Sequence, residues 1–139
     1  MTTAAFEERL KELGLGEGWR WEKGSWWLEA PETFNVRTNT ETLIRHGARF
    51  VAITAIELPS KEVRLDYQWD LNGQLLSIIT ATAAHKIATI ADLIPAADWV
   101  ERETYEYFAV EFTGRANTIP LMMRAGDPVG INLHKEAAQ

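Results

Sequence analysis

The sequence predicts an α+β protein, with an antiparallel sheet flanked by helices and an extended C-terminal arm. Three consecutive segments predict the sheet. Residues 48–58 form a run rich in β-branched and aromatic side chains, and apolar and polar side chains alternate over residues 61–71. Asn72-Gly73 follows, before a third apolar segment over residues 74–83. This dipeptide suits a two-residue hairpin turn because both central residues of that turn need positive φ. The three segments therefore predict an antiparallel meander.

The first helix is indicated by apolar residues at helical spacing. Phe6, Leu10 and Leu13 fall at positions i, i+4 and i+7, with charged side chains between them, and Gly14 and Gly16 follow. Between this helix and the meander, Trp19 and Trp21 alternate with charged residues, as in a strand. The sequence thus begins with a short amphipathic helix and a strand-like segment.

Three further helical segments are expected. Asn39 or Thr40 is a suitable N-cap for a helix before Gly47. Residues 88–95 read as a short helical turn that closes before Pro95, and Asp98 is a suitable cap for a helix over residues 98–108.

The domain organisation follows from where these patterns end. Residues 1–114 are expected to form a single α+β domain. Residues 115–139 contain no sustained period and are expected to form an extended tail that becomes ordered against a partner surface.

Composition narrows the possible functions. The chain has 139 residues, of which 46% are hydrophobic, and a formal charge of −6, which makes nucleic acid an unsuitable partner. It contains no cysteine, which excludes disulfides, iron–sulfur ligation by this chain and thiol nucleophiles. The N-terminus does not resemble a signal peptide, and no apolar run is long enough for a membrane helix. A cytoplasmic, soluble protein is expected.

The search for catalytic motifs finds no strong candidate. Glu101, Glu103 and Glu106 are the carboxylates considered for general acid–base chemistry, and they leave a hydrolase open as a minor alternative. On a helix, however, Glu101 lies roughly 160–200° away from Glu103. The three histidines, which fall in three different elements, are expected to be structural. They are His46, His85 and His134.

No phosphate-binding glycine motif or nucleophile elbow is present. The sequence therefore predicts no activity of its own and no bound cofactor or metal.

Tryptophan is concentrated near the N-terminus. Trp69 lies on the apolar side of an alternating strand and is expected in the core. Trp19, Trp21, Trp26 and Trp27 are many for a small core, so the sequence leaves open whether some of them lie at an interface.

The stretch IATIADLIPAADWVERETYEYFAVEFTGRAN resembles the signature of the 30-kilodalton subunit of respiratory complex I, which also occurs in the matching subunit of energy-converting [NiFe] hydrogenases. The residues that match are Pro95, Ala96, Ala97, Trp99, Glu101, Arg102, Glu103, Tyr105, Phe108, Phe112 and Gly114. Residues 47–55 also look like the first core strand of the family, so the resemblance covers roughly residues 40–117.

Several positions depart from the family pattern. Glu106 stands where the family has aspartate, Ala109 where it has glycine, and Arg115-Ala116 where it has His-Pro. The long arm of the complex I proteins is not recognisable after residue 119. These departures favour the short form of the subunit found in hydrogenase complexes.

The resemblance implies a subunit without cofactor or activity, which packs beside the catalytic large subunit and the iron–sulfur small subunit of a membrane-bound redox complex. Such a protein is peripheral to the membrane, on its cytoplasmic side. An energy-converting [NiFe] hydrogenase is the expected complex, with the equivalent (C) component of a NADH:quinone oxidoreductase, also called NADH dehydrogenase, as the alternative. A free-standing small-ligand binding protein that uses the tryptophan-rich region as its pocket is the alternative from another class. The residues expected to dock on partners are Trp99, Glu101, Arg102, Glu103, Tyr105, Glu106, Phe108 and Arg115.

Overall fold

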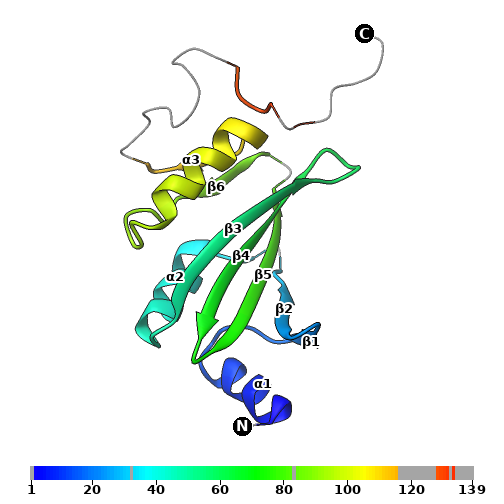
Figure 1. Ribbon diagram of the computed structural model, residues 1–139, viewed down its shortest axis with the longest axis vertical. Helices are drawn as coiled ribbons and strands as arrows, with labels where there is room; N and C mark the ends of the chain where they lie inside the picture. Colours follow the sequence, from blue (N-terminus) through cyan, green and yellow to red (C-terminus); the bar gives the residue numbers. More distant parts are fainter. Residues whose placement is uncertain (1, 32, 83, 116–127, 132, 134–139) are drawn as a thin grey trace. The chain divides into compact units, whose positions relative to one another are not determined.

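The computed structural model describes residues 2–31, 33–82, 84–115, 128–131 and 133. The chain has α+β architecture, as expected, with a five-stranded sheet in the order β1-β2-β5-β4-β3 and a two-stranded sheet of β6 and β7 (Figure 1). It divides into two compact units, Met1–Thr54 with Asp66–Thr80, and Ala55–Leu65 with Ala81–Gln139. The predicted border between a domain over 1–114 and a tail over 115–139 stays a prediction. Residues 116–127 of that tail lie outside the described residues.

The three strands of the meander are present. They are β3 (Arg49–Glu57), β4 (Val63–Leu71) and β5 (Gln74–Thr82). The hairpin turn between β4 and β5 has positive φ at both central residues, 53° at Asn72 and 83° at Gly73. The side chain of Asp70 accepts a hydrogen bond from the Gly73 N–H (2.8 Å). The backbone geometry confirms the reason for which this dipeptide predicted a hairpin.

The alternation in β4 places Val63, Leu65, Tyr67, Trp69 and Leu71 in the core, as expected. The opposite face is less exposed than the alternation suggested, because β4 lies between two other strands and its Asp66 is buried.

The first unit begins with α1 (Thr3–Glu12), whose Phe6 and Leu10 are buried. The strands β1 (Arg20–Glu22) and β2 (Ser25–Glu29) form an antiparallel pair. β2 then pairs in parallel with β5, so the sheet is mixed rather than wholly antiparallel. Trp26 packs between Phe6 and Trp21, with ring centroids 5.5 and 5.2 Å away.

The second helix, α2 (Val36–Arg45), begins earlier than expected. Its N-cap is Asn35, whose Oδ1 accepts hydrogen bonds from the N–H groups of Arg37 and Thr38 (both 3.1 Å). The prediction of Asn39 or Thr40 as the cap was wrong: Thr40 is buried within the helix. A polar residue at a helix start and one in its first turns look alike in sequence, and packing decides between them.

The second unit contains β6 (Lys86–Ala88), α3 (Ala97–Phe108) and β7 (Glu111–Thr113). β6 and β7 pair in parallel. The helical turn expected over 88–95 is present, since the Ile94 N–H donates to the Ile90 carbonyl (2.8 Å), but the sequence pattern did not reveal the strand before it. The core of this unit contains Val63, Leu65, Ile90, Ala97, Val110 and Phe112.

Candidate functional site: the signature helix and its buried ion pairs

The signature residues 97–108 form α3. Its N-cap is Ala96, which makes no side-chain capping bond, so the expectation that Asp98 caps the helix was wrong. Asp98 instead lies in the first turn, where a carboxylate interacts favourably with the helix dipole. The helix ends at Ala109, in the left-handed conformation (φ 56°).

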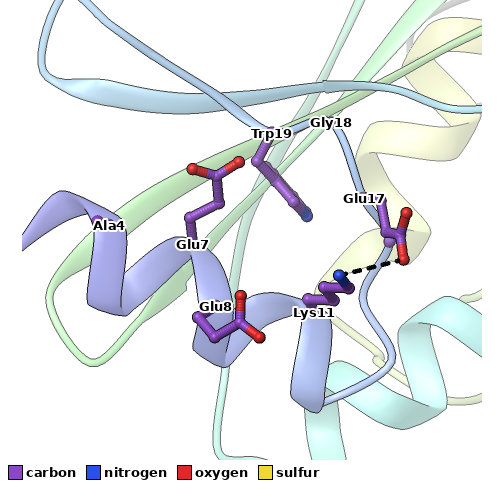
Figure 2. Close-up of a pocket in the computed structure, with 8 residues that line it drawn as sticks. Ala4, Glu7, Glu8, Lys11, Glu17, Gly18 and Trp19 are labelled. Carbon is purple, nitrogen blue, oxygen red and sulfur yellow. Dashed lines mark ion pairs between the residues drawn. The ribbon is translucent and has the colours of Figure 1, made fainter.

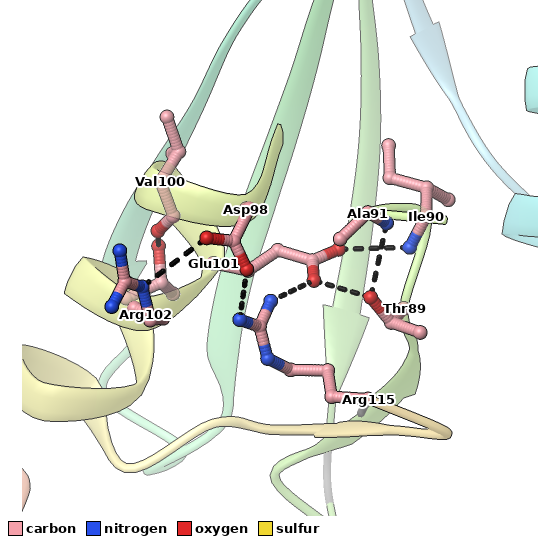
Figure 3. Close-up of polar contacts among 9 residues, drawn as sticks. Thr89, Ile90, Ala91, Asp98, Val100, Glu101, Arg102 and Arg115 are labelled. Carbon is pink, nitrogen blue, oxygen red and sulfur yellow. Dashed lines mark hydrogen bonds and ion pairs between the residues drawn. The ribbon is translucent and has the colours of Figure 1, made fainter. Parts of the chain in front are cut away.

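Glu101 is the centre of the site and is fully buried, with no exposed surface. Its Oε2 accepts a hydrogen bond from the Ile90 N–H (2.9 Å), and its Oε1 accepts from the Thr89 hydroxyl and from Nη1 of Arg115 (2.7 Å) (Figure 3). The Thr89 hydroxyl in turn accepts from the Ala91 N–H (3.1 Å). Each carboxylate oxygen therefore has a donor, as a buried charge requires.

Arg115 joins the helix to the segment after β7. Besides Glu101, its guanidinium contacts Asp98 through Nη2, so one arginine bridges two carboxylates one helical turn apart (Figure 3). The Arg115 side chain is 10% exposed. Where the family signature has histidine, this chain has an arginine that pairs with the buried glutamate of the same signature.

The ion pairs continue from Asp98 towards the surface. Nε of Arg102 lies 3.4 Å from the second oxygen of Asp98. The guanidinium carbon of Arg102 lies 5.9 Å from the centroid of the Trp99 ring, within the range of a cation–π contact. A chain of charged contacts thus leads from the buried Glu101 to the exposed Trp99.

Burial raises the pKa of Glu101 above its ordinary value of 4.5, because desolvation disfavours the carboxylate. The hydrogen bonds from Ile90, Thr89 and Arg115 act in the opposite direction and offset part of this effect. A perturbed carboxyl group can mark a catalytic acid. Here, however, the chain itself supplies these three donors and covers the whole side chain, so the arrangement fits a structural ion pair better than a hydrolase site.

The eight expected docking residues fall into two groups. Trp99 (57% exposed) and Tyr105 (45%) are exposed, and Arg102, Glu103 and Phe108 are partly exposed. Glu101, Glu106 and Arg115 lie inside the unit, with Glu106 only 3% exposed. The docking role of the first group stays a prediction. The side chains of the second group are covered by the chain itself and present little or no surface to a partner.

Glu106 lies near the C-terminal end of α3, where a later segment returns. The N–H of Gly130 donates to the Glu106 carbonyl (2.7 Å), and that of Ile131 lies further away (3.4 Å). This contact satisfies one of the carbonyl groups that a helix leaves without a partner at its end. The part of the expected tail that the structure describes therefore contacts the signature helix.

The remaining candidates have structural positions. Nε2 of His85 lies within hydrogen-bond distance (2.9 Å) of the Lys61 carbonyl, and His134 lies outside the described residues. Within the described ranges, no group of three or more potential metal ligands comes together. Trp69 is in the core as expected, and so are Trp19 and Trp26, whereas Trp21 remains 45% exposed.

Sequence reasoning missed the partners of Glu101. Thr89, the Ile90 main chain and Arg115 lie 11 to 14 positions from it, and no local period connects them. The available signal was the departure from the family pattern at Arg115, which introduces a cation in a signature rich in acids.

The fold and this site define an α+β protein whose signature helix is held by buried ion pairs. Residues 35–137 match the family model described as respiratory-chain NADH dehydrogenase, 30 Kd subunit, and the chain belongs to that family. In the described ranges, no helix is both long and apolar enough to cross a membrane.

Three curated relatives illustrate the family. The C component of the NADH-quinone oxidoreductase of Rhodopseudomonas palustris (strain BisB18) is 32% identical over 74 residues, covering 48% of this chain and 37% of the relative. The same component from Methylobacterium sp. (strain 4-46) is 27% identical over 105 residues, covering 71% and 49%. The mitochondrial NADH-ubiquinone oxidoreductase 30.4 kDa subunit of Neurospora crassa is 30% identical over 79 residues, covering 53% and 28%. The matches thus span less than half of each relative's length.

A solved structure supports the fold. The chain superposes on a trypsin-resistant fragment of Nqo5 with a TM-score of 0.63 and 18% identity, covering 81% of this chain and 98% of the fragment. The curated relatives described here carry NADH dehydrogenase names. They favour the NADH:quinone oxidoreductase alternative and give the hydrogenase interpretation no support.

Proposed function

We propose that this protein is a non-catalytic subunit of a NADH:quinone oxidoreductase complex, equivalent to the C component of its relatives. Family membership and the names of the relatives support this assignment. In this role the chain assembles with the catalytic and iron–sulfur subunits and is peripheral to the cytoplasmic side of the membrane through them.

The observation that carries the proposal is the exposed aromatic surface of α3. Trp99 is 57% exposed although it belongs to the family signature, and Arg102 lies over its ring. Tyr105 is exposed nearly two turns further along the same helix. Tryptophan, tyrosine and arginine are the residues most enriched at protein–protein hot spots. An amphipathic ring gains most when a partner covers its apolar part.

The buried ion pairs prepare this surface for binding. Asp98 contacts both Arg115 and Arg102, so the position of Arg102 over Trp99 is connected to the buried part of the network. A surface whose side chains are already held in place loses less conformational entropy on binding. In this proposal Glu101 and Arg115 position the helix, while Trp99, Arg102, Glu103 and Tyr105 contact the partner.

The experiment is a pull-down of the tagged chain from its native membranes in mild detergent. The co-purified subunits are identified by mass spectrometry, and the eluate is assayed for NADH oxidation with a quinone acceptor and for hydrogen evolution. NADH-oxidising partners with quinone-dependent activity are the expected result. A [NiFe] large subunit with hydrogen evolution would overturn the assignment in favour of a hydrogenase complex. Recovery of the chain without partners would overturn assembly altogether.

A further inference from the structure

A second feature lies in the first unit, away from the signature helix in sequence. A pocket of about 240 Å³ lies between α1 and the loop that follows it. Four residues of α1 line it, Ala4, Glu7, Glu8 and Lys11, and four residues of the loop, Gly16, Glu17, Gly18 and Trp19 (Figure 2). This volume is below the roughly 300–1,000 Å³ typical of sites for drug-sized ligands, so it suits a ligand of amino-acid size.

The charges of the lining are unbalanced. Three glutamates and one lysine line the pocket. Lys11 Nζ lies 3.7 Å from Glu17 Oε1, in a pair whose side chains are 55% and 75% exposed. No described residue forms an ion pair with Glu7 or Glu8. The pocket therefore combines two uncompensated carboxylates with one loosely paired ammonium group.

An acidic cluster on a helix is ordinarily a solvated surface, but here a buried donor accompanies it. Trp19 is only 4% exposed, and its Nε1 is buried and has no hydrogen-bond partner among the described residues. Figure 2 shows this nitrogen pointing towards Lys11 and Glu17. A buried N–H without an acceptor is unfavourable, so a group that supplies an acceptor is stabilised there.

The loop keeps this position open. Gly16 has φ of 105°, which favours glycine, and a Cβ there would lie 3.9 Å from Nε1 of Trp19 and 2.9 Å from Cδ2 of Leu28. Glycine thus lets the loop backbone pass beside the indole nitrogen.

We infer that this pocket binds a small basic amino acid, a ligand that carries one carboxylate and a cationic side chain. The carboxylate displaces Glu17 from Lys11 and accepts from the Trp19 N–H, while the cationic side chain pairs with Glu7 and Glu8. Displacing the Lys11–Glu17 pair costs little, because long ion pairs between exposed side chains contribute little to stability. The inference is independent of the assembly role proposed for α3.

The test is an NMR titration of the full-length chain labelled with ¹⁵N, following the indole N–H resonance of Trp19. That resonance is assigned by its loss in Trp19→Phe. The probe is L-lysine, and two matched compounds each lack one group: norleucine has no side-chain ammonium, and 1,5-diaminopentane has no carboxylate. We expect L-lysine to shift the resonance saturably at millimolar concentration and to bind at least about fivefold more tightly than either compound. Equal responses to all three, or no saturable shift with L-lysine or the peptide below, would overturn the inference.

Two further arms define the site and the source of the ligand. Glu7→Gln with Glu8→Gln is expected to weaken lysine binding about fivefold, whereas Glu12→Gln, on the same helix but outside the pocket, leaves it unchanged. Equal loss in both variants would overturn the site. A peptide ending in a lysine with a free carboxylate is compared with the same peptide ending in an amide. Binding of free lysine identifies a free amino acid as the ligand, and binding of only the carboxylate-ended peptide identifies a protein C-terminus.

Discussion

The guanidinium of Arg115 lies 2.7 Å from the carboxylate of Glu101, a side chain with no exposed surface. The same guanidinium contacts Asp98, so it connects the segment after β7 to two positions of α3. Because both partners are buried or nearly so, this pair differs in energy from the exposed ion pairs elsewhere on the chain.

Replacing Arg115 by alanine is expected to lower the free energy of unfolding by about 3–5 kcal/mol, because Glu101 then loses its cation while it stays buried. The measurement is urea unfolding followed by far-UV circular dichroism. Arg49→Ala is the control, since Arg49 pairs with Asp70 at 3.1 Å but its side chain is 77% exposed. That variant is expected to lose at most about 1 kcal/mol. Similar losses in the two variants would contradict the distinction.

The raised pKa of Glu101 predicts a pH dependence with a definite sign. The folded state holds the Glu101 proton more tightly than the unfolded state, so this group stabilises the fold fully below the ordinary pKa of 4.5. That contribution is lost as the pH rises through the higher pKa of the folded state.

Glu101→Gln removes this titration. The difference in unfolding free energy, wild type minus Glu101→Gln, is therefore expected to decrease as the pH rises from below 4.5 through the raised pKa. Urea unfolding of both proteins across this range measures it. A difference that increases with pH would mean that the hydrogen bonds to the carboxylate outweigh its desolvation.

The exposed surface of α3 predicts a change in assembly without a change in stability. Trp99→Ala is expected to cost about 2 kcal/mol of binding free energy towards the partner subunits, as truncation of a hot-spot tryptophan does. Trp21→Ala is the matched control, because Trp21 is also exposed, at 45%, but lies in β1. The two variants are compared by the amounts of partner subunits recovered and by thermal unfolding of the isolated chain. Unchanged recovery with Trp99→Ala would remove the main support for this docking surface.

Gly130 predicts how the returning segment contacts α3. Its φ is 85°, and a Cβ there would lie 2.9 Å from Leu133 Cδ1 and 3.3 Å from Ala109 Cβ. Gly130→Ala is therefore expected to weaken the hydrogen bond to the Glu106 carbonyl and to speed hydrogen exchange of the amide at position 130. Gly24→Ala is the control, since Gly24 also has positive φ (77°) but a Cβ there would meet nothing within 4 Å. Protection of position 130 that survives the substitution would show that this contact does not hold the segment.

The N-cap of α2 gives a local test. Asn35→Ala is expected to cost about 1 kcal/mol, because two N–H groups lose their acceptor. Asn39→Ala, within the helix, is expected to be neutral or slightly stabilising because alanine has the higher helix propensity. Urea unfolding distinguishes the two positions, and an equal effect of both substitutions would contradict the assignment of the cap.

The sequence by itself determined the elements whose signals are local. The alternation over β4, the Asn72-Gly73 turn and the helical spacing of Phe6 and Leu10 each depend on residues a few positions apart. Period and turn chemistry act at that range, so they could be read without a structure. The signature helix was recognisable in the same way, because its matching residues are nearly contiguous.

Tertiary structure alone decided the rest. The parallel pairing of β2 with β5 joins residues about fifty positions apart, and the choice of Trp19 and Trp26 rather than Trp21 for burial follows from packing. The role of Glu101 was decided in the same way. A glutamate in an acidic helix predicts a wet surface, and only Thr89, Ile90 and Arg115, brought to it by the fold, make its burial as a charged group possible. Burial and ion pairing depend on distances in space, which a linear pattern does not encode.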